Sequence, residues 1–347
     1  MKAQSPARVL VTGGAGFIGA HVVKALRERY PESGLRVLHL PRERLDNLDG
    51  LDGLEFVAGD VTVREEVDAA VAGCDVVFHL AAIYALWLPD MDVMRRVNVE
   101  GTRNVLDACR RHGVRRVVHT SSAVCFCGQG LDVESDERSP FSMEGMPYAA
   151  TKRASHELAE RFAADGLDVV IVCPAAPIGP GDIGPTPTGR MIVEIFRLPF
   201  AVALRTLVNV IDVRDCALGH VLALERGRKG ESYLLAGENF GHAEILERAL
   251  ALCGRKARII ELPPSTLLPL AHLLALAAQI TGRAPLLTPA EIRQARGGLV
   301  CDGAKARREL GLHVRPLDES LRDAVAWFAE RGRIRLRGSR REPPGAT

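Results

Sequence analysis

The stretch Thr12-Gly13-Gly14-Ala15-Gly16-Phe17-Ile18-Gly19 joins an apolar run at 7–11 to a segment of helical periodicity at 17–29. Glycine at every third position allows a tight turn, close approach of the backbone to a pyrophosphate, and close packing of the helix on the strand. The free N–H groups at the start of such a helix, together with its dipole, favour phosphate. The order strand, turn, helix therefore predicts a dinucleotide site formed by Gly13, Gly16, Phe17, Ile18 and Gly19.

Apolar runs and helical patterns alternate along the first half of the chain. Strands that are apolar at consecutive positions are buried on both faces, as in a parallel sheet covered by helices. With right-handed crossovers this alternation predicts an α/β fold, a Rossmann-type doubly wound parallel sheet. Runs rich in β-branched residues recur at 35–40, 56–58, 75–80, 116–120 and 168–173, and helical patterns lie at 94–112 and 148–165.

This alternation changes after Pro174. Residues 177–189 are rich in proline and glycine, which indicates a loop or hinge. A short helix is predicted at 190–198 and strands at 208–211 and 233–236, so we expect a smaller C-terminal α/β lobe that binds substrate. The predicted division assigns 1–175 and 206–237 to the dinucleotide-binding domain, 176–205 and 238–330 to the substrate lobe, and 331–347 to a basic, disordered tail.

Composition narrows the class of protein. The chain has 347 residues and a formal net charge of +2, which is too near zero to argue for nucleic acid or an anionic surface as a partner. Its 8 cysteines show no C-x-x-C pair and no neighbouring histidine pattern, which predicts buried free thiols in a reducing compartment and no metal site. The first residues lead directly into a strand without the apolar stretch of a signal peptide, so we expect a cytoplasmic protein.

The uncharged, Leu/Ala-rich segment 262–282 admits two interpretations. Prolines at 263, 264 and 269 suit the start of a helix in a soluble protein, and the apolar run itself, 267–280, is short for a membrane span. We therefore expect a buried helix, or one that lines an apolar pocket, without membrane insertion. Contact with a membrane surface is the alternative.

A second motif carries the chemistry. Ser121-Ser122-Ala123 follows the strand at 116–120, and Tyr148-Ala149-Ala150-Thr151-Lys152 opens a helix. The i, i+4 spacing places Tyr148 and Lys152 on one helical face, and strand ends at the carboxyl edge of an open sheet face the ligand crevice. A tyrosine with its ordinary pKa of about 10 is a poor acid–base group at neutral pH, and a nearby ammonium lowers that pKa. The pattern predicts that Ser122 orients a substrate oxygen and Tyr148 transfers its proton, while hydride moves between nicotinamide and carbon.

The end of the second predicted strand bears on the choice between NAD and NADP. An acidic residue there would accept the ribose hydroxyls of NAD. This chain instead has Leu40-Pro41-Arg42-Glu43-Arg44, in which Arg42 or Arg44 could meet a 2′-phosphate. Pairing of Glu43 with one of these arginines is the alternative. The sequence favours NADP over NAD, with Arg42 as the residue that meets the phosphate.

Together these motifs resemble the extended short-chain dehydrogenase/reductases over nearly the whole chain. In that family the tyrosine and lysine, here Tyr148 and Lys152, also contact the cofactor. The family has a helix asparagine behind the active site, here Asn98 in Val97-Asn98-Val99, although a packing or capping role is the alternative. The resemblance further implies cofactor contacts by Asp60 and Val61 near the adenine, by Ala81 and Ala82 beside the cofactor, and by Pro174 near the nicotinamide.

Within the family, residues 80–87 and 179–190 are similar to the hopanoid-associated sugar epimerases, a group itself similar to dihydroflavonol 4-reductases. Dehydratases of the family place an Asp-Glu pair after the serine, where this chain has Ala123-Val124, so elimination is disfavoured. Nucleotide-sugar epimerases hold the diphosphate with an asparagine and an arginine. This chain has Ala175-Ala176 and Val208 at those places, which leaves a buried diphosphate without its usual partners.

Apolar side chains indicate the substrate class. Tyr84 and Trp87 could form part of an apolar substrate wall, and Arg190 is a candidate polar contact. We expect an NAD(P)-dependent oxidoreductase that acts at an alcohol or carbonyl carbon of a fairly apolar or lipid-linked small molecule. A redox-neutral sugar epimerase that retains its dinucleotide and a non-catalytic dinucleotide-binding scaffold are the alternatives. The resemblance also implies a homodimer formed through helices 94–112 and 149–165.

Overall fold

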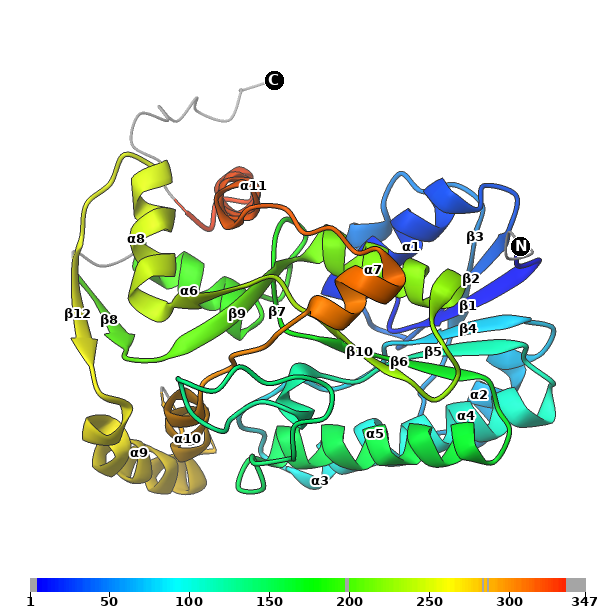
Figure 1. The fold of residues 1–347 in the computed structure, drawn as a ribbon, viewed down its shortest axis with the longest axis horizontal. Coiled ribbons are helices and arrows are strands. Elements are labelled where there is room, and N and C mark those ends of the chain that lie inside the picture. Colours follow the sequence, from blue (N-terminus) through cyan, green and yellow to red (C-terminus); the bar gives the residue numbers. More distant parts are fainter. Residues whose placement is uncertain (1–4, 197–199, 283, 286, 335–347) are drawn as a thin grey trace.

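The computed structural model describes residues 5–196, 200–282, 284–285 and 287–334. Its main sheet has seven parallel strands in the order β10-β6-β5-β4-β1-β2-β3 (Figure 1). The strand order reverses between β1 and β4, which creates a crevice at the carboxyl ends of these two strands. The strands are β1 (Arg8–Thr12), β2 (Gly34–His39), β3 (Leu54–Ala58), β4 (Val76–His79), β5 (Arg116–Thr120), β6 (Val169–Pro174) and β10 (Ser232–Leu235).

Helices cover both faces of this sheet, as the doubly wound prediction requires. Side chains of β1 alternate between the two faces: Val9 and Val11 pack into one core and Leu10 into the other. Because both faces are buried, the strands are apolar at consecutive positions. The predicted α/β class is thus confirmed. One face carries α1 (Phe17–Arg29) and α7 (Val213–Arg226); the other carries α2 (Arg64–Val71), α4 (Thr102–Arg111) and α5 (Pro147–Ala164) (Figure 1).

The helix predicted at 94–112 contains an irregularity. It begins as α3 (Asp92–Arg95), widens into a π-helical turn (Arg96–Gly101) and continues as α4. Gly101 lies against Val61: a Cβ at this position would come within 2.7 Å of a Val61 methyl group. Single π-helical turns inside α-helices occur frequently at functional sites, and this turn contains Asn98.

A second region lies beyond the carboxyl end of the sheet, around a separate core. Residues 206–237 contribute to both regions, because β10 joins the main sheet while β9 pairs with β7 and β11. The domain limits stay a prediction. The region contains two small sheets. One consists of β7 (Ala176–Ile178), β9 (Leu207–Asp212) and β11 (Glu238–Gly241), and the other of β8 (Phe200–Leu204) and β12 (Arg258–Leu262). Its helices are α6 (Pro187–Ile195), α8 (His242–Leu252), α9 (Leu268–Thr281), α10 (Pro289–Gly297) and α11 (Leu317–Glu330).

The expectation that segment 262–282 forms a buried helix is wrong. The segment forms a 3₁₀ turn (Pro264–Leu267) and then α9, and only Ala271 and Ala278 of α9 are buried. Leucine and isoleucine side chains on the other faces of α9 are exposed to solvent. Apolar composition alone indicates that such a surface must be covered, but it does not say by what.

The structure also tests the predictions for the cysteines and for the helix at 190–198. Seven of the eight cysteines are buried and all are free, as predicted, with Cys253 half-buried. The predicted helix at 190–198 begins earlier, at Pro187, because Thr186 caps it by accepting from the Gly189 N–H. Most of the predicted basic tail, 335–347, lies outside the described residues.

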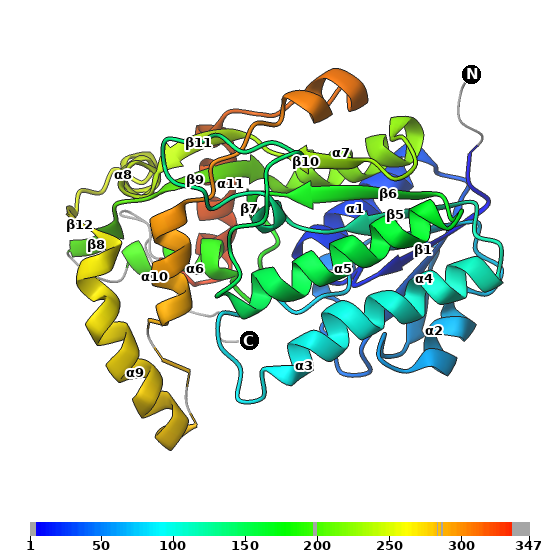
Figure 2. The same ribbon diagram turned by 60° about the horizontal axis from the view of Figure 1, so that its bottom comes forward.

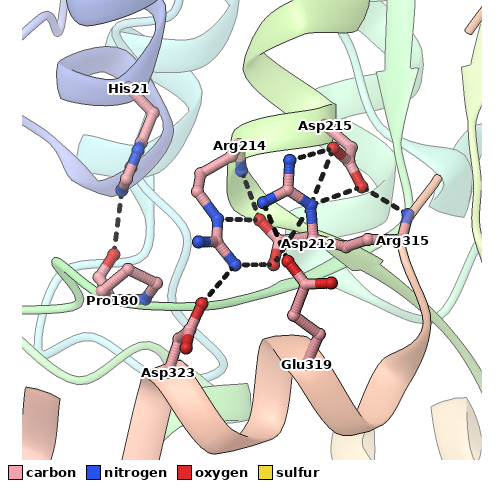
Figure 3. A network of polar contacts seen from close by, with 8 residues as sticks. All are labelled: His21, Pro180, Asp212, Arg214, Asp215, Arg315, Glu319 and Asp323. Atoms are coloured by element: carbon pink, nitrogen blue, oxygen red, sulfur yellow. Dashed lines mark hydrogen bonds and ion pairs between the residues drawn. The ribbon is translucent and has the colours of Figure 1, made fainter. Parts of the chain in front are cut away.

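An ion-pair network joins the C-terminal helix to the end of β9 and the start of α7 (Figure 3). Arg315 precedes α11 and holds the buried Asp215 of α7 in a two-pronged contact, with an Nη2–Oδ1 distance of 2.8 Å. Arg214 contacts the buried Asp212 at 2.8 Å and Asp323 of α11 at 2.7 Å. These pairs fix α11, and with it the second region, against α7.

Candidate active site

The glycine loop lies at the point where the strand order reverses. Gly13 has a φ of +67°, a conformation that only glycine adopts readily. A Cβ on Gly13 would lie 2.8 Å from the backbone of Ala81, and one on Gly19 would lie 2.1 Å from the Gly13 carbonyl oxygen. The loop is therefore built at backbone contact distance, which fits the predicted approach of a pyrophosphate.

The start of α1 is open toward this loop. Gly16 is its N-cap, no side chain caps it, and its first turn contains no acidic residue. Phe17 and Ile18 are only half-buried. The first N–H groups of a helix lack partners within the helix, and its dipole is positive at this end. The predicted dinucleotide residues thus fit a phosphate group, and the structure brings all five into one turn.

The end of β2 presents a free cation. The alternative that Glu43 pairs with an arginine is contradicted, because its carboxylate accepts from the Leu40 N–H at 3.0 Å. Arg44 pairs with Asp46. Arg42 is exposed, and within the described part of the chain it forms no ion pair or hydrogen bond. A free guanidinium at this position suits a 2′-phosphate.

Asp60 and Val61 form the turn after β3, at the same edge of the sheet as the end of β2. One Asp60 carboxylate oxygen accepts from the Thr62 N–H at 2.8 Å. Val61 is buried, and its carbonyl accepts from Asn104 at 3.0 Å. These contacts order the turn and are compatible with the implied position beside an adenine, which stays a prediction.

A buried chain of hydrogen bonds, which the sequence motifs did not identify, fixes Ala81 beside the glycine loop. The Ala81 N–H donates to Thr12 Oγ1 at 3.2 Å, and Thr12 bonds His79 Nδ1 at 2.8 Å. His79 Nε2 bonds Thr102 Oγ1 at 3.0 Å, and Thr102 donates to the Asn98 carbonyl at 2.7 Å. The single hydroxyl proton of Thr102 is donated to that carbonyl, so Thr102 Oγ1 can only accept from His79. His79 Nε2 must therefore carry a proton, and His79 Nδ1 must accept from the Thr12 hydroxyl.

His79 is therefore neutral, and burial lowers its pKa to about 3. A polar residue at the carboxyl end of an otherwise apolar strand was the signal that could have found Thr12 and His79. Ala82 is exposed beside this chain, and Pro174 is buried at the end of β6, where it aligns with Leu235 of β10. Both lie at the carboxyl edge of the sheet, as the resemblance implies.

Ser122, Tyr148 and Tyr84 meet at this edge. The Ser122 hydroxyl is near enough to the Tyr148 phenol to lower the pKa of that phenol, and the Tyr84 ring lies against the Tyr148 ring with centroids 4.6 Å apart. Burial raises the pKa of Tyr148, the neighbouring Tyr84 raises it further, and the nearby Ser122 hydroxyl lowers it. The serine and the tyrosine, 26 residues apart in sequence, thus lie close enough for one to affect the pKa of the other.

Lys152 lies one helical turn after Tyr148 and is buried. Its ammonium donates to the Thr120 carbonyl at 2.7 Å, and burial lowers its pKa to about 8. We expected this ammonium to lower the pKa of Tyr148. In the structure the pKa of Tyr148 is instead raised, because burial of the phenol is the largest effect on it. The lysine is therefore one helical turn from the tyrosine, but its ammonium is held by the end of β5.

Asn98 joins the two halves of the site. Its side-chain oxygen accepts from the Ile83 N–H at 2.7 Å, and its amide nitrogen donates to the Ile83 carbonyl at 3.0 Å and to Thr151 at 3.1 Å. Thr151 in turn donates to the Tyr148 carbonyl at 2.9 Å. Asn98 thus fixes the loop that carries Tyr84 against the helical turn that carries Tyr148.

The other predicted substrate residues are less closely connected. Trp87 is half-buried, and Arg190 is exposed on α6, near the buried carboxylate of Asp182. Neither forms a hydrogen bond, ion pair or ring contact with Tyr148 in the described structure. On metals, no group of three or more His, Cys, Asp or Glu side chains is arranged to hold an ion among the described residues.

Comparisons with known proteins agree on one family. The model of the NAD dependent epimerase/dehydratase family matches residues 9–236. The chain is 35% identical to a putative dihydroflavonol 4-reductase of Synechocystis, over 94% of this chain and 95% of that protein. It is 36% identical to sterol demethylase protein B of Methylococcus capsulatus, over 94% and 99%. The crystal structure of gox2253 is 34% identical, with a TM-score of 0.83 over 95% of this chain and 100% of that one.

Proposed function

The chain belongs to the NAD dependent epimerase/dehydratase family and is an enzyme; from this premise we propose that it reduces or oxidises an alcohol or carbonyl carbon of a fairly apolar small molecule. The observation that carries the proposal is the arrangement of three side chains: Ser122 follows the end of β5, Tyr148 lies on α5 near its hydroxyl, and the buried Lys152 lies one helical turn further and donates to the Thr120 carbonyl at the end of β5. This combination supplies a proton donor, a group that orients the substrate oxygen, and a cation nearby.

The chain's own residues account for cofactor binding. Backbone N–H groups at the start of α1 would hold the pyrophosphate, since Gly13 and Gly19 leave no room for side chains there. Arg42 would hold a 2′-phosphate, because no described acid neutralises it. This favours NADP over NAD. When bound, the nicotinamide supplies or accepts a hydride.

Proton transfer is assigned to Tyr148. Its pKa is raised by burial, so the phenol is protonated at neutral pH and is suited to donate to a developing alkoxide. Ser122 would hold the same substrate oxygen through its hydroxyl. Lys152, with a pKa of about 8, is largely charged at neutral pH and would stabilise the phenolate that remains. Asn98 acts as a positioning residue through Ile83 and Thr151.

Two features support a reductase over the other activities of the family. After Ser122, the residues Ala123 and Val124 are apolar and buried in a 3₁₀ turn, so no acid or base follows the serine. Ala175 and Val208 supply no charge for a sugar diphosphate. An apolar substrate is supported by the Tyr84 ring over Tyr148 and by the name of one relative, a sterol demethylase protein.

The test is cofactor consumption. Purified protein with NADPH and a panel of apolar ketones, sterol ketones included, should oxidise one NADPH for each alcohol formed, and Tyr148→Phe should lower the rate by about 10²–10⁴-fold while NADPH still binds. An epimerase would interconvert substrates without net consumption. Conversion of sugar nucleotides without NADPH oxidation, or a Tyr148→Phe variant with full activity, would contradict the proposal.

A further inference from the structure

The outer end of the second region carries an unusual number of exposed apolar side chains. Seven of the thirteen large apolar side chains that are exposed in the described structure belong to β8, β12 and α9. Both ribbon views place these elements at the same end of the molecule, away from the N-terminus (Figures 1 and 2). The seven are Phe200, Val202, Ile260, Leu270, Leu273, Leu276 and Ile280.

The helix α9 turns its apolar side outward. At about 100° per residue, the exposed leucines and isoleucine of α9 fall within an arc of about 120°, and the buried Ala271 and Ala278 lie on the opposite side. Leu273 is 66% and Ile280 81% exposed, more than the packing of a soluble domain requires. Figure 2 shows α9 projecting from the body with α10 behind it.

The small sheet beside α9 shows the same pattern. Val202 of β8 aligns with Ile260 of β12, and both are exposed, whereas Ala203, the next residue of β8, is buried in the core of the region. Side chains alternate between faces along a strand, so one face of this pair packs inward and the other presents Phe200, Val202 and Ile260 to solvent.

Unpaired cations surround this apolar surface. Arg205, Lys256, Arg258 and Arg296 lie on or next to β8, β12 and α10, all are exposed, and none forms an ion pair with a described acid. Over residues 253–296 the chain has six Lys or Arg and two acidic residues. The net charge of the whole chain, +2, conceals this local excess. An apolar helix rimmed by cations has the chemistry of a helix that lies on an anionic bilayer.

We propose that α9 and the outer face of the β8–β12 sheet dock on an anionic lipid bilayer, with α9 lying in the interface and not spanning it. The apolar stretch Pro264–Thr281 is long and apolar enough to span, with a mean hydropathy of 1.2. However, it begins with a proline-containing 3₁₀ turn and is anchored on one side by Ala271 and Ala278. Its exposed side can enter the headgroup region while the cations meet anionic lipid.

Docking in this orientation brings the candidate site close to the membrane. Behind α9, the next helix, α10, carries Arg293, which donates to the Gly145 carbonyl three residues before Tyr148. The pKa of Tyr84 is raised mainly by burial and to a smaller extent by the charge of Glu291, which is also on α10. An apolar substrate dissolved in the bilayer would then be near the helix that contacts the site. That last step rests on the proposed function, whereas docking itself does not.

Vesicle flotation of the full chain tests the docking surface. Wild-type protein should float with phosphatidylcholine vesicles that contain 30% phosphatidylglycerol and bind phosphatidylcholine alone about tenfold more weakly or less. Leu273→Gln combined with Ile280→Gln should reduce flotation at least about tenfold. A matched control changes two exposed apolar side chains elsewhere, Leu218→Gln with Val133→Gln, and should float like the wild type.

Circular dichroism and NADPH binding of each variant, both measured without substrate, establish that the fold and the cofactor site are intact. Absence of wild-type flotation, or equal flotation of the α9 variant and the wild type, would overturn the proposal. Loss of a dimer in the α9 variant, with no flotation of either protein, would identify a second copy of the chain as the occupant and also overturn it. Since flotation involves no turnover, its outcome is independent of the reductase assay.

Discussion

Tyr148 and Lys152 illustrate how little a shared helical face says about electrostatics. Both belong to α5, one turn apart, yet the ammonium donates to the Thr120 carbonyl whereas the phenol lies near Ser122 and Tyr84. Burial acts on the two groups in opposite directions, because it disfavours the charged form of each: it raises the pKa of the tyrosine and lowers that of the lysine. At neutral pH the phenol is therefore protonated and the amine mostly charged.

The first prediction at the residue scale concerns pH. Since the pKa of Lys152 is about 8, its charge is present below that pH and lost above it, and kcat/KM for carbonyl reduction should fall as pH rises beyond about 8. Lys152→Met should lower kcat/KM by about 100-fold or more and remove this dependence. Below pH 8 the buried lysine is charged in the folded state, which lowers the free energy of unfolding. Replacing it with methionine removes this cost, so the Tm of the variant at pH 7 should not fall. A pH profile unchanged by the substitution would contradict the assignment.

The second prediction concerns Arg42. Arg42→Glu should weaken NADPH binding by about tenfold or more and improve the relative affinity for NADH, because a carboxylate repels the 2′-phosphate and accepts from ribose hydroxyls. Isothermal titration with both dinucleotides measures the change. Arg44→Gln is the matched control, because Arg44 already pairs with Asp46 and its loss should leave the preference unaltered. Equal NADPH affinity in wild type and Arg42→Glu would show that NADP is not the preferred cofactor.

At the scale of elements, the turn between β1 and α1 is the tightest contact in the site. The missing side chains of Gly13 and Gly19 let the loop, the end of β4 and the start of α1 share one small volume. The π-helical turn before α4 has the complementary role, since it brings Asn98 to Ile83 and Thr151 at once. The glycine turn thus leaves space for the dinucleotide, and the π-helical turn fixes the residues around Tyr84 and Tyr148.

The prediction at this scale is that Gly19→Ala damages both stability and binding. Its Cβ would lie 2.1 Å from the Gly13 carbonyl oxygen and 2.8 Å from Gly14 Cα, so backbone must move. We expect a loss of about 1–3 kcal/mol in the free energy of unfolding and about tenfold or more in dinucleotide affinity. At Gly16, the N-cap of α1, the nearest atom is 3.2 Å away, so Gly16→Ala should cost less than Gly19→Ala, about 0.5–1 kcal/mol. Urea unfolding and titration of the dinucleotide would separate these effects, and equal stabilities of the two variants would contradict the packing argument.

At the scale of the whole molecule, two regions with separate cores must keep one geometry. The network around Asp212 and Asp215 provides this link, since Arg214 and Arg315 tie the start of α7 to α11 (Figure 3). Beside this network, His21 of α1 bonds the Pro180 carbonyl at 2.9 Å, which fixes the proline-rich loop to the dinucleotide helix.

Removal of Arg315 should therefore be costly. Arg315→Met leaves the buried Asp215 without its two-pronged partner, and we expect a loss of about 3–5 kcal/mol in the free energy of unfolding. Arg96→Met is the control, because Arg96 and its acidic partners are exposed, and its loss should change stability by about 0–1 kcal/mol. Urea titrations at one pH compare the two, and equal losses would mean that the network does not hold the regions together.

The predicted homodimer also belongs to this scale. Light scattering at micromolar concentration should give a mass near twice 37.5 kDa, with α4 and α5 at the interface as the family resemblance implies. Charge reversal on the outer side of α4, at Arg103 and Arg110, should then favour the monomer, whereas the α9 variant should leave the dimer intact. A monomeric wild-type protein would contradict the prediction.

Much of the fold and part of the site followed from local sequence. The glycine loop and the apolar strands of the main sheet are encoded by residues close together in the chain, because turn conformation and side-chain periodicity are local properties. The pair Tyr148 and Lys152 was visible for the same reason, since four residues make one helical turn. Ser122 could be added because parallel strands end at one edge of a sheet.

Only the tertiary structure decided the remainder, and the reason is physical. Asn98 meets Ile83 and Thr151 across 15 and 53 residues, and Thr12 meets His79 across 67. Hydrogen bonds of this range depend on how helices and strands pack, which no local pattern records. Segment 262–282 is the clearest case: its composition indicates a covered helix, whereas its exposure depends on the position of α10 and the β8–β12 sheet. Sequence determined that the segment is apolar, and the fold determined that its apolar side faces outward.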